Sequence, residues 1–234
     1  MRAWEYHSRV VRERQAREAV ESARAETASA TAADADQFAL MLTALDADCR
    51  QLSALPQGSA RTERKRGLIR TWLPVVETYL KSGAKYKNVI LTQTMIWLFD
   101  VGEIDNAMRL ARVAVAQNQP MPARFKRDIR TGVADLLLYW VNTRNGQPIE
   151  PYFSEIFEAV IPPDDAPGWA IHEEIKLKYI RVAIREAERN NPVRALELCK
   201  LAERIAPGRA KVKTKRAELE KKLKAQRRIL NVEL

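Results

Sequence analysis

The sequence predicts an all-α protein, and three observations support this prediction. The 234 residues include only 8 glycines and 11 prolines. Long runs rich in alanine, arginine, glutamate, lysine and leucine lie between them, without alternating β-branched segments bounded by turn residues. Hydrophobic residues make up 46% of the chain, which is enough to bury a core. We expect N-terminal helices, then packed helical hairpins, then a basic C-terminal helix.

Residues 1–58 are expected to form an N-terminal helical region, a candidate for DNA binding or assembly. Arginine and glutamate alternate at four-residue spacing from Arg9 to Glu21, a pattern that supports an exposed helix. A hinge is predicted at 29–34, with a second helix running on to about Ala54. The two helices around the hinge are a candidate helix-turn-helix. The second has the stronger apolar face, formed by Phe38, Leu42, Leu45 and Leu52.

Residues 59–146 are expected to form a central helical core, and residues 147–208 a second region of helical hairpins. Pro74 either opens a helix or kinks one. Segments 90–120 and 178–207 each show a helix, a short polar turn and an alanine-rich helix that ends near a proline. Both resemble single tetratricopeptide-type units, although they are too far apart in sequence to form an array. Residues 209–234 are predicted to be the basic C-terminal helix.

The central region also contains a block that is similar to a known family. The block includes Trp72-Leu73-Pro74, Met95-Ile96-Trp97-Leu98-Phe99-Asp100-Val101-Gly102-Glu103-Ile104-Asp105-Asn106-Ala107-Met108, Ala111-Arg112-Val113-Ala114 and Gln119-Pro120-Met121-Pro122. It resembles the core of the GpM family of small terminase subunits of temperate tailed phages. The resemblance covers 61–122 well and extends more loosely to 207.

This resemblance implies a role in packaging viral DNA. Small terminase subunits bind viral DNA at the packaging site, assemble as rings and pass the DNA to a large subunit with ATPase and nuclease activity. The implied partners are therefore double-stranded viral DNA, a large terminase subunit and further copies of this chain in a homo-oligomer, expected to be a ring. The implied location is the host cytoplasm. Family members are often described as the terminase endonuclease subunit.

Charge gives an independent reason to expect DNA binding. The chain has 40 lysines and arginines against 30 acidic residues, a net charge of +10. Segment 61–87 has eight basic and two acidic residues, and segment 209–228 has ten basic and two acidic residues. Clustered cations neutralise phosphates and release counterions. The candidate DNA-binding residues are Arg61, Arg64, Lys65, Arg66, Arg70, Lys211, Lys213, Lys215, Arg216, Lys221, Lys222, Lys224, Arg227 and Arg228.

Segment 150–175 has the opposite character, with seven acidic residues and neither lysine nor arginine. Two interpretations stay open for it. The segment either repels DNA from one face of the molecule or pairs with a basic surface of a neighbouring subunit. Assembly is also suggested by Trp72, Trp97, Trp140 and Trp169, because tryptophan is enriched at protein interfaces.

The sequence lacks the common signatures of catalysis and of cofactor or metal binding. It has neither a nucleotide-binding phosphate loop nor a serine nucleophile elbow. Its two histidines and two cysteines, Cys49 and Cys199, are widely separated. We therefore expect no cofactor, no metal and no catalytic residue. No apolar run reaches the ~20 residues of a membrane span, and the N-terminus does not resemble a secretory signal.

Two weak carboxylate patterns keep a nuclease open as an alternative. Pro163-Asp164 with Glu174-Ile175-Lys176 matches the pattern of metal-dependent nucleases, but those nucleases place the second part on a strand, whereas helix is predicted here. Asp100, Glu103 and Asp105 surround Gly102, where the simpler interpretation is a helix end at Gly102 and a helix cap at Asp105. A metal-dependent endonuclease and a tetratricopeptide-like protein adaptor are the two alternatives to the small terminase subunit.

Overall fold

The computed structural model describes residues 35–143, 146–163 and 166–230, and every regular element in these ranges is a helix. The all-α prediction is therefore confirmed. The predicted first helix and the hinge at 29–34 lie outside the described residues. None of the described helices is long and apolar enough to cross a membrane. Past a helical segment at 35–54, the helices are α2 (Ser59–Lys81), α3 (Val89–Val101), α4 (Ile104–Ala116), α5 (Ile129–Thr143), α6 (Tyr152–Val160), α7 (Glu173–Asn190), α8 (Pro192–Ile205) and α9 (Lys213–Leu230).

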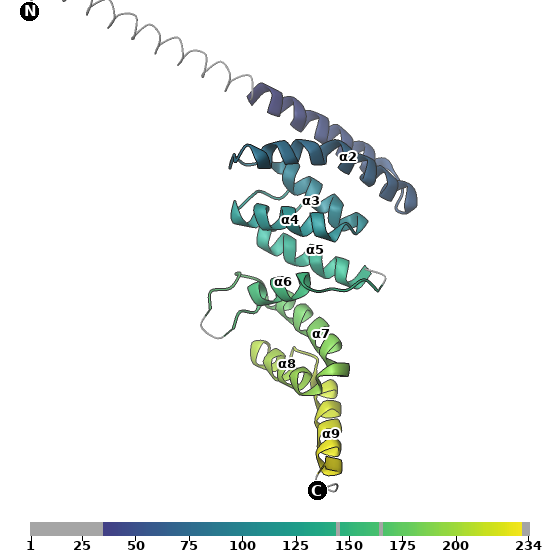
Figure 1. Cartoon of the computed structure of the whole chain (residues 1–234), viewed down its shortest axis with the longest axis vertical. Coiled ribbons are helices and arrows are strands. Elements are labelled where there is room, and N and C mark those ends of the chain that lie inside the picture. Colours follow the sequence, from purple (N-terminus) through teal and green to yellow (C-terminus); the bar gives the residue numbers. More distant parts are fainter. Residues whose placement is uncertain (1–34, 144–145, 164–165, 231–234) are drawn as a thin grey trace, which may run out of the picture. The chain divides into compact units, whose positions relative to one another are not determined.

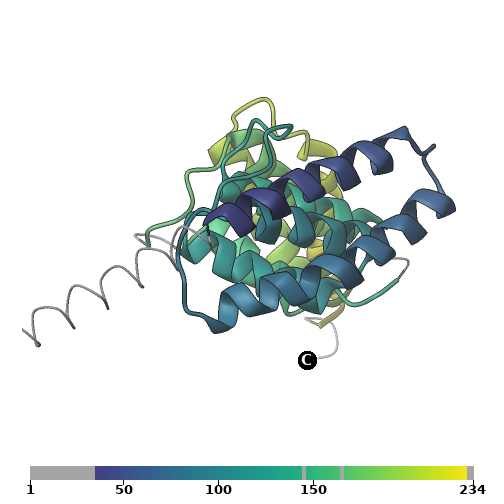
Figure 2. The same cartoon turned by 90° about the horizontal axis from the view of Figure 1, so that it is seen from above.

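The described residues fall into two compact units that meet between Leu68 and Ile69, inside α2. In the first unit, a short turn at 55–58 joins helical segment 35–54 to the start of α2 (Figure 2). Leu45 and Leu52 of the predicted apolar face are buried, together with Leu68 of α2. The other two residues of the predicted apolar face, Phe38 and Leu42, are half-buried.

In the second unit the helices pack in the order of the sequence (Figure 1). Helix α5 contacts both α3 and α4, then α6 and α7, and the contacts continue from α7 to α8 and from α8 to α9. Every residue of α3 from Ile90 to Phe99 is buried. A helix that is buried on all sides belongs in a core, and α3 lies at the centre of its neighbours although Thr92, Gln93 and Thr94 are polar.

The two predicted hairpins occur where the sequence places them. Gly102 closes α3 in the left-handed conformation (φ 82°), which glycine adopts without a steric penalty. The Asn191 side chain accepts a hydrogen bond from the backbone N–H of Arg194 and starts α8, with Pro192 in its first turn. The likeness of the two hairpins to tetratricopeptide units stays a prediction. Pro74 lies inside α2, so the helix continues through it.

Three of the four tryptophans proposed as assembly surface belong to the core of the chain itself. Trp72 is 5% exposed, Trp97 is 0% exposed and Trp140 is 2% exposed. Their use as evidence for assembly was therefore wrong, because packing within one chain already buries these rings. Only Trp169 is partly exposed.

A buried hydrogen-bond network includes the Gln119 side chain and the Pro120 carbonyl, in the turn after α4. The Gln119 side chain accepts a hydrogen bond from the Asn88 backbone N–H (2.7 Å) and donates to the Tyr79 hydroxyl (2.9 Å). The Thr92 hydroxyl donates to the Pro120 carbonyl (2.8 Å). These bonds join α2, α3 and the turn after α4, and they satisfy polar groups that would be costly to bury unpaired.

Candidate nucleic-acid interface

The predicted basic cluster at 61–70 lies on α2, where several of its cations bind groups of the first unit. The Arg64 guanidinium donates to Asp48 Oδ1 (2.9 Å) and to Gln51 Oε1 (3.0 Å). Arg61 donates to the Leu55 carbonyl (3.4 Å), at the end of the preceding helical segment. These two arginines therefore hold the helical segment and α2 together, a role that sequence reasoning did not assign to them.

The other members of this cluster differ in their surroundings. Arg66 pairs with Glu63 one turn earlier on α2. Lys65 is half-buried and interacts with another group of the chain. Arg70 is exposed and forms no ion pair with any described residue. Among the described residues, Arg70 is the one cation of the α2 cluster with neither a hydrogen bond nor a charge partner.

The C-terminal basic cluster starts on a well-packed turn and continues along α9. Ala210, Val212 and Leu219 are buried in one cluster with residues of α7 and α8. Because these apolar residues pack against α7 and α8, they fix the first turns of α9 to the rest of the unit. The lysines and arginines between them therefore lie on a fixed backbone. The cluster is therefore a structured surface from Arg209 to at least Leu219.

Two cations of α9 are neutralised by acidic residues. The Lys215 ammonium lies 3.0 Å from Glu188 of α7 and 3.0 Å from Glu218. Hydrogen bonds to Glu188 and then Glu218 raise the pKa of Lys215 above its ordinary value, so it stays charged. The two carboxylates balance the charge of Lys215, so it attracts a phosphate less strongly than an unpaired lysine does.

Arg216 is neutralised in the same way. It binds Glu220 on α9 (2.9 Å) and Glu203 on α8 (2.6 Å). These two hydrogen bonds, the one to Glu220 first, raise the pKa of Arg216. The arginine thereby links α9 to α8.

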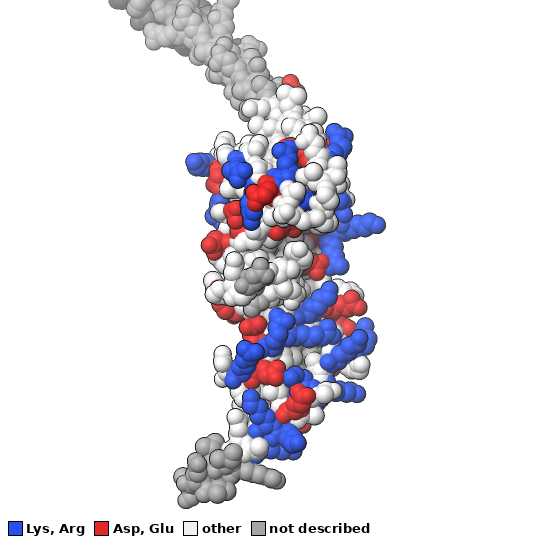
Figure 3. All heavy atoms as spheres, turned by 90° about the vertical axis from the view of Figure 1, so that its right-hand side faces the viewer, with Lys and Arg blue, Asp and Glu red and all other residues white. Residues whose placement is uncertain are grey.

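The remaining lysines of this region are available to a ligand. All are exposed, and none forms an ion pair with a described residue. The side chains of Arg227 and Arg228 lie outside the described residues. Lysine and arginine side chains gather over α7, α8 and α9 on the face drawn in Figure 3. Acidic side chains cover less of this part of the face than basic ones do. The exposed lysines are Lys211, Lys213, Lys221, Lys222 and Lys224.

The acidic segment at 150–175 pairs in part with cations of the same chain. Glu155 of α6 forms a two-pronged ion pair with Arg112 of α4, at 2.8 and 2.6 Å. Glu173 lies 2.7 Å from Arg209. Both interpretations of this segment therefore omitted a third use, which is to hold helices of the same chain together.

A set of cations on α7 escaped the sequence analysis. Helix α7 has five basic and four acidic residues, so its net charge drew no attention. The signal was in the spacing: four cations recur at intervals of three and four residues, which places them on one face of a helix. All four are exposed. They are Lys178, Arg181, Arg185 and Arg189.

Neither nuclease pattern forms a metal site among the residues that the structure describes. Glu174 and Lys176 lie on α7, where two residues turn the helix by about 200° and separate the side chains. Asp164 is outside the described residues. In the other pattern, Asp105 accepts a hydrogen bond from Tyr152.

The prediction that Asp105 caps α4 needs correction. Glu103 occupies the cap position, without a hydrogen bond from its side chain, and Asp105 lies in the first turn. The prediction that Gly102 ends the preceding helix is confirmed. His172 also has a structural position, because its Nδ1 accepts the Glu174 backbone N–H at the start of α7.

The fold and its surface define a class of protein: an all-helical chain whose candidate site is an exposed charged surface. Three hollows in the described part of the chain lie on α7 and between α8 and α9, and charged side chains contribute to the lining of each. The family model for the phage small terminase subunit matches residues 42–168, more than half of the chain. The chain belongs to the phage small terminase subunit family.

Two phage proteins show how far the similarity extends. The probable terminase endonuclease subunit of Haemophilus phage HP1 (strain HP1c1) is 34% identical over 158 residues, which cover 66% of this chain and 54% of that protein. The terminase endonuclease subunit of Escherichia phage P2 is 36% identical over 87 residues, which cover 37% of this chain and 35% of that protein. The chain thus spans about half or less of the length of these relatives. No solved structure matches.

Proposed function

We propose that this chain is the small terminase subunit that binds viral DNA, assembles with copies of itself and delivers the DNA to a large ATPase and nuclease subunit inside the host cell. Family membership supports the packaging role. The observation that carries the DNA-binding part is the set of exposed lysines of the C-terminal region, which have no acidic partner among the described residues. Mobile ammonium groups bind phosphate without reading base sequence.

The test is duplex binding by the triple variant Lys221→Gln/Lys222→Gln/Lys224→Gln over a series of salt concentrations. Each lost phosphate contact lowers the slope of log K against log salt by about 0.9. We therefore expect weaker binding and a slope smaller by about 2 to 3 for this variant. These lysines are exposed, so the fold should be unaffected.

A matched control removes three exposed cations from the loop before α5 and from its first turn: Arg124→Gln/Lys126→Gln/Arg130→Gln. It lowers the net charge equally. Equal loss of affinity in both triple variants would mean that total charge, not this surface, governs binding. Light scattering on the parent protein tests self-association, and a monomer at every concentration would contradict the assembly part of the proposal.

A second candidate, a metal-dependent endonuclease, is favoured by the names of the two relatives. It needs at least two carboxylates around Mg²⁺. The test is cutting of duplex DNA with Mg²⁺ by the parent chain and by Glu174→Ala and Asp100→Ala. We expect no cutting by any of the three. Cutting by the parent that either variant abolishes would establish the endonuclease instead.

A further inference from the structure

Helix α7 has exposed cations along one face, and the turn that leads into α9 contacts this helix. Lys178, Arg181, Arg185 and Arg189 lie within about 80° of each other around α7, at 100° per residue. The other sides of the helix bury Ile175, Leu177, Tyr179, Ile180, Val182 and Ile184. The stripe is thus the solvent face of a fixed helix, about 16 Å long at 1.5 Å per residue.

Three contacts join this stripe to the C-terminal cluster. Arg181 donates a hydrogen bond to the Ala210 carbonyl (3.2 Å). At the start of α7, Glu173 pairs with Arg209, and near its end Glu188 pairs with Lys215. The turn between α8 and α9 therefore contacts α7. Lys211 in this turn and Lys213 at the start of α9 are exposed, and both line a hollow with Glu203 of α8.

The same contacts leave the stripe with an excess of positive charge. Two of the four carboxylates of α7, Glu173 and Glu188, are engaged by cations of the turn and of α9. Glu186 lies 3.6 Å from Arg185, and Glu174 stays at the N-terminal end of the stripe. Lys178 and Arg189 form no ion pair with the described residues.

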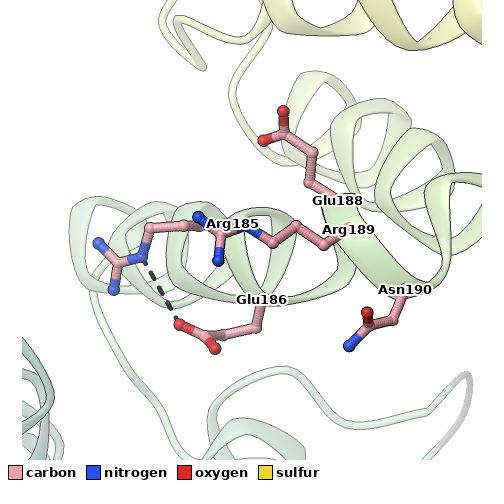
Figure 4. A pocket seen from close by; sticks show the side chains of 5 residues that line it. All are labelled: Arg185, Glu186, Glu188, Arg189 and Asn190. Atoms are coloured by element: carbon pink, nitrogen blue, oxygen red, sulfur yellow. Dashed lines mark ion pairs between the residues drawn. The ribbon is translucent and has the colours of Figure 1, made fainter. Parts of the chain in front are cut away.

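The end of the stripe offers room for an anionic group. A hollow of about 470 Å³ is lined by Arg185, Glu186, Glu188, Arg189 and Asn190. Figure 4 shows the Arg185 and Arg189 side chains extending in the same direction along the helix, with Glu188 pointing to the opposite side from Glu186. Two guanidinium groups one turn apart suit phosphate oxygens, which arginine binds with paired N–H groups.

We propose that the α7 stripe, together with Lys211 and Lys213, is a phosphate-backbone site for duplex DNA. The inference rests on the DNA-binding function proposed above and assigns it a second surface. The axial length of the stripe matches roughly five base pairs at 3.4 Å each. The site is expected to bind the backbone, because its side chains are cations and the phosphates carry the charge that cations neutralise.

The test compares duplex binding by the full chain with binding by Lys178→Gln/Arg185→Gln/Arg189→Gln. Arg181 is kept because it holds the turn at Ala210. The probe is a 30-base-pair duplex of arbitrary sequence, and the control is again Arg124→Gln/Lys126→Gln/Arg130→Gln. We expect a salt slope smaller by about 2 to 3, at about 0.9 per contact, and an unchanged slope for the control. Circular dichroism and the melting temperature verify that both variants fold.

Several outcomes would overturn this inference. The α7 variant could bind DNA as tightly as the parent while only the Lys221, Lys222 and Lys224 variant binds more weakly. That result would overturn the proposal that the α7 stripe binds DNA and would leave the proposed function standing. Loss of self-association in the α7 variant, with DNA binding intact, would assign the stripe to an acidic protein surface. A parent chain that binds no duplex even at low salt would remove the DNA-binding function and the stripe together.

Discussion

At the scale of single residues, the cations divide into those that stabilise the chain and those that can bind a ligand. Arg64 and Arg216 each have two partners on the same chain. Lys221 and Lys224 are exposed and form no ion pair with described residues. Sequence reasoning treated all of them alike, because the partner of a cation depends on which helices pack together. Glu188 and Lys215, for example, are 27 residues apart in the chain.

Gly102 gives a test of the hairpin that the family-like block forms. An alanine there would have open space around its Cβ, yet it would have to adopt φ +82°. We expect Gly102→Ala to lower the free energy of unfolding by about 1 to 2 kcal/mol, the cost of a left-handed residue with a Cβ. Urea denaturation measures the change. Gly102→Asn is the control and should cost less, because asparagine tolerates this conformation. Equal stability of Gly102→Ala and the parent would contradict this account of the turn.

Tyr179 tests the junction of α5, α6 and α7. Its hydroxyl donates to the Ala134 carbonyl (2.9 Å), and its ring stacks on Phe153, with ring centroids 5.5 Å apart. Burial raises the pKa of the phenol well above its ordinary value, so it remains a neutral donor. We expect Tyr179→Phe to lower the free energy of unfolding by about 1 kcal/mol and to leave DNA binding unchanged. An unchanged stability in urea, or a loss of DNA affinity, would contradict this purely structural role.

At the scale of elements, α9 combines packing with charge. Leu219 is 2% exposed, whereas the ion pairs of Lys215 and Arg216 are partly exposed. Solvent screens such ion pairs, so they contribute little to stability, whereas removing a buried leucine costs about 2 to 5 kcal/mol. Apolar contacts therefore contribute most to holding α9 in place.

This difference gives a prediction for α9. We expect Leu219→Ala to destabilise the chain by about 2 to 4 kcal/mol and to speed proteolytic cleavage after residue 209. Arg216→Met should cost less than Leu219→Ala, because solvent screens the ion pairs of Arg216. Urea denaturation and limited proteolysis compare the two variants. A larger loss in Arg216→Met than in Leu219→Ala would mean that ion pairs hold the helix. The same packing makes point substitutions a cleaner test of DNA binding than removal of residues 209–234.

The hairpins show what could be predicted at this scale. Gly102, Asn191 and Pro192 are local signals, and each lies where the sequence placed a helix boundary. The face of α7 that bears Arg185 and Arg189 was missed because the acidic residues near the two ends of the helix bring its total charge close to zero. Only the packing of the α8–α9 turn against α7 shows where two of those carboxylates are engaged.

At the scale of the whole molecule, the family-like block and the candidate DNA-binding surface are different parts of the chain. Trp72, Met95, Trp97, Phe99 and Met108 of the block are buried. The similarity therefore identified a fold and a family, whereas function had to be argued from exposed charge. The chain was correctly predicted to be helical from its composition and spacing. The partners of its cations could not be predicted, because they join segments far apart in sequence.

The most direct test of DNA binding by this surface is lysine-reactivity footprinting of the full chain, by mass spectrometry with and without a duplex. We expect the duplex to protect Lys178, Lys211, Lys213, Lys221, Lys222 and Lys224, since their ammonium groups would be covered by phosphate. Lys126, exposed in the loop before α5, should react equally in both samples. Unchanged reactivity of the α7 and C-terminal lysines on a saturating duplex, or protection of Lys126 alone, would contradict the proposed surface.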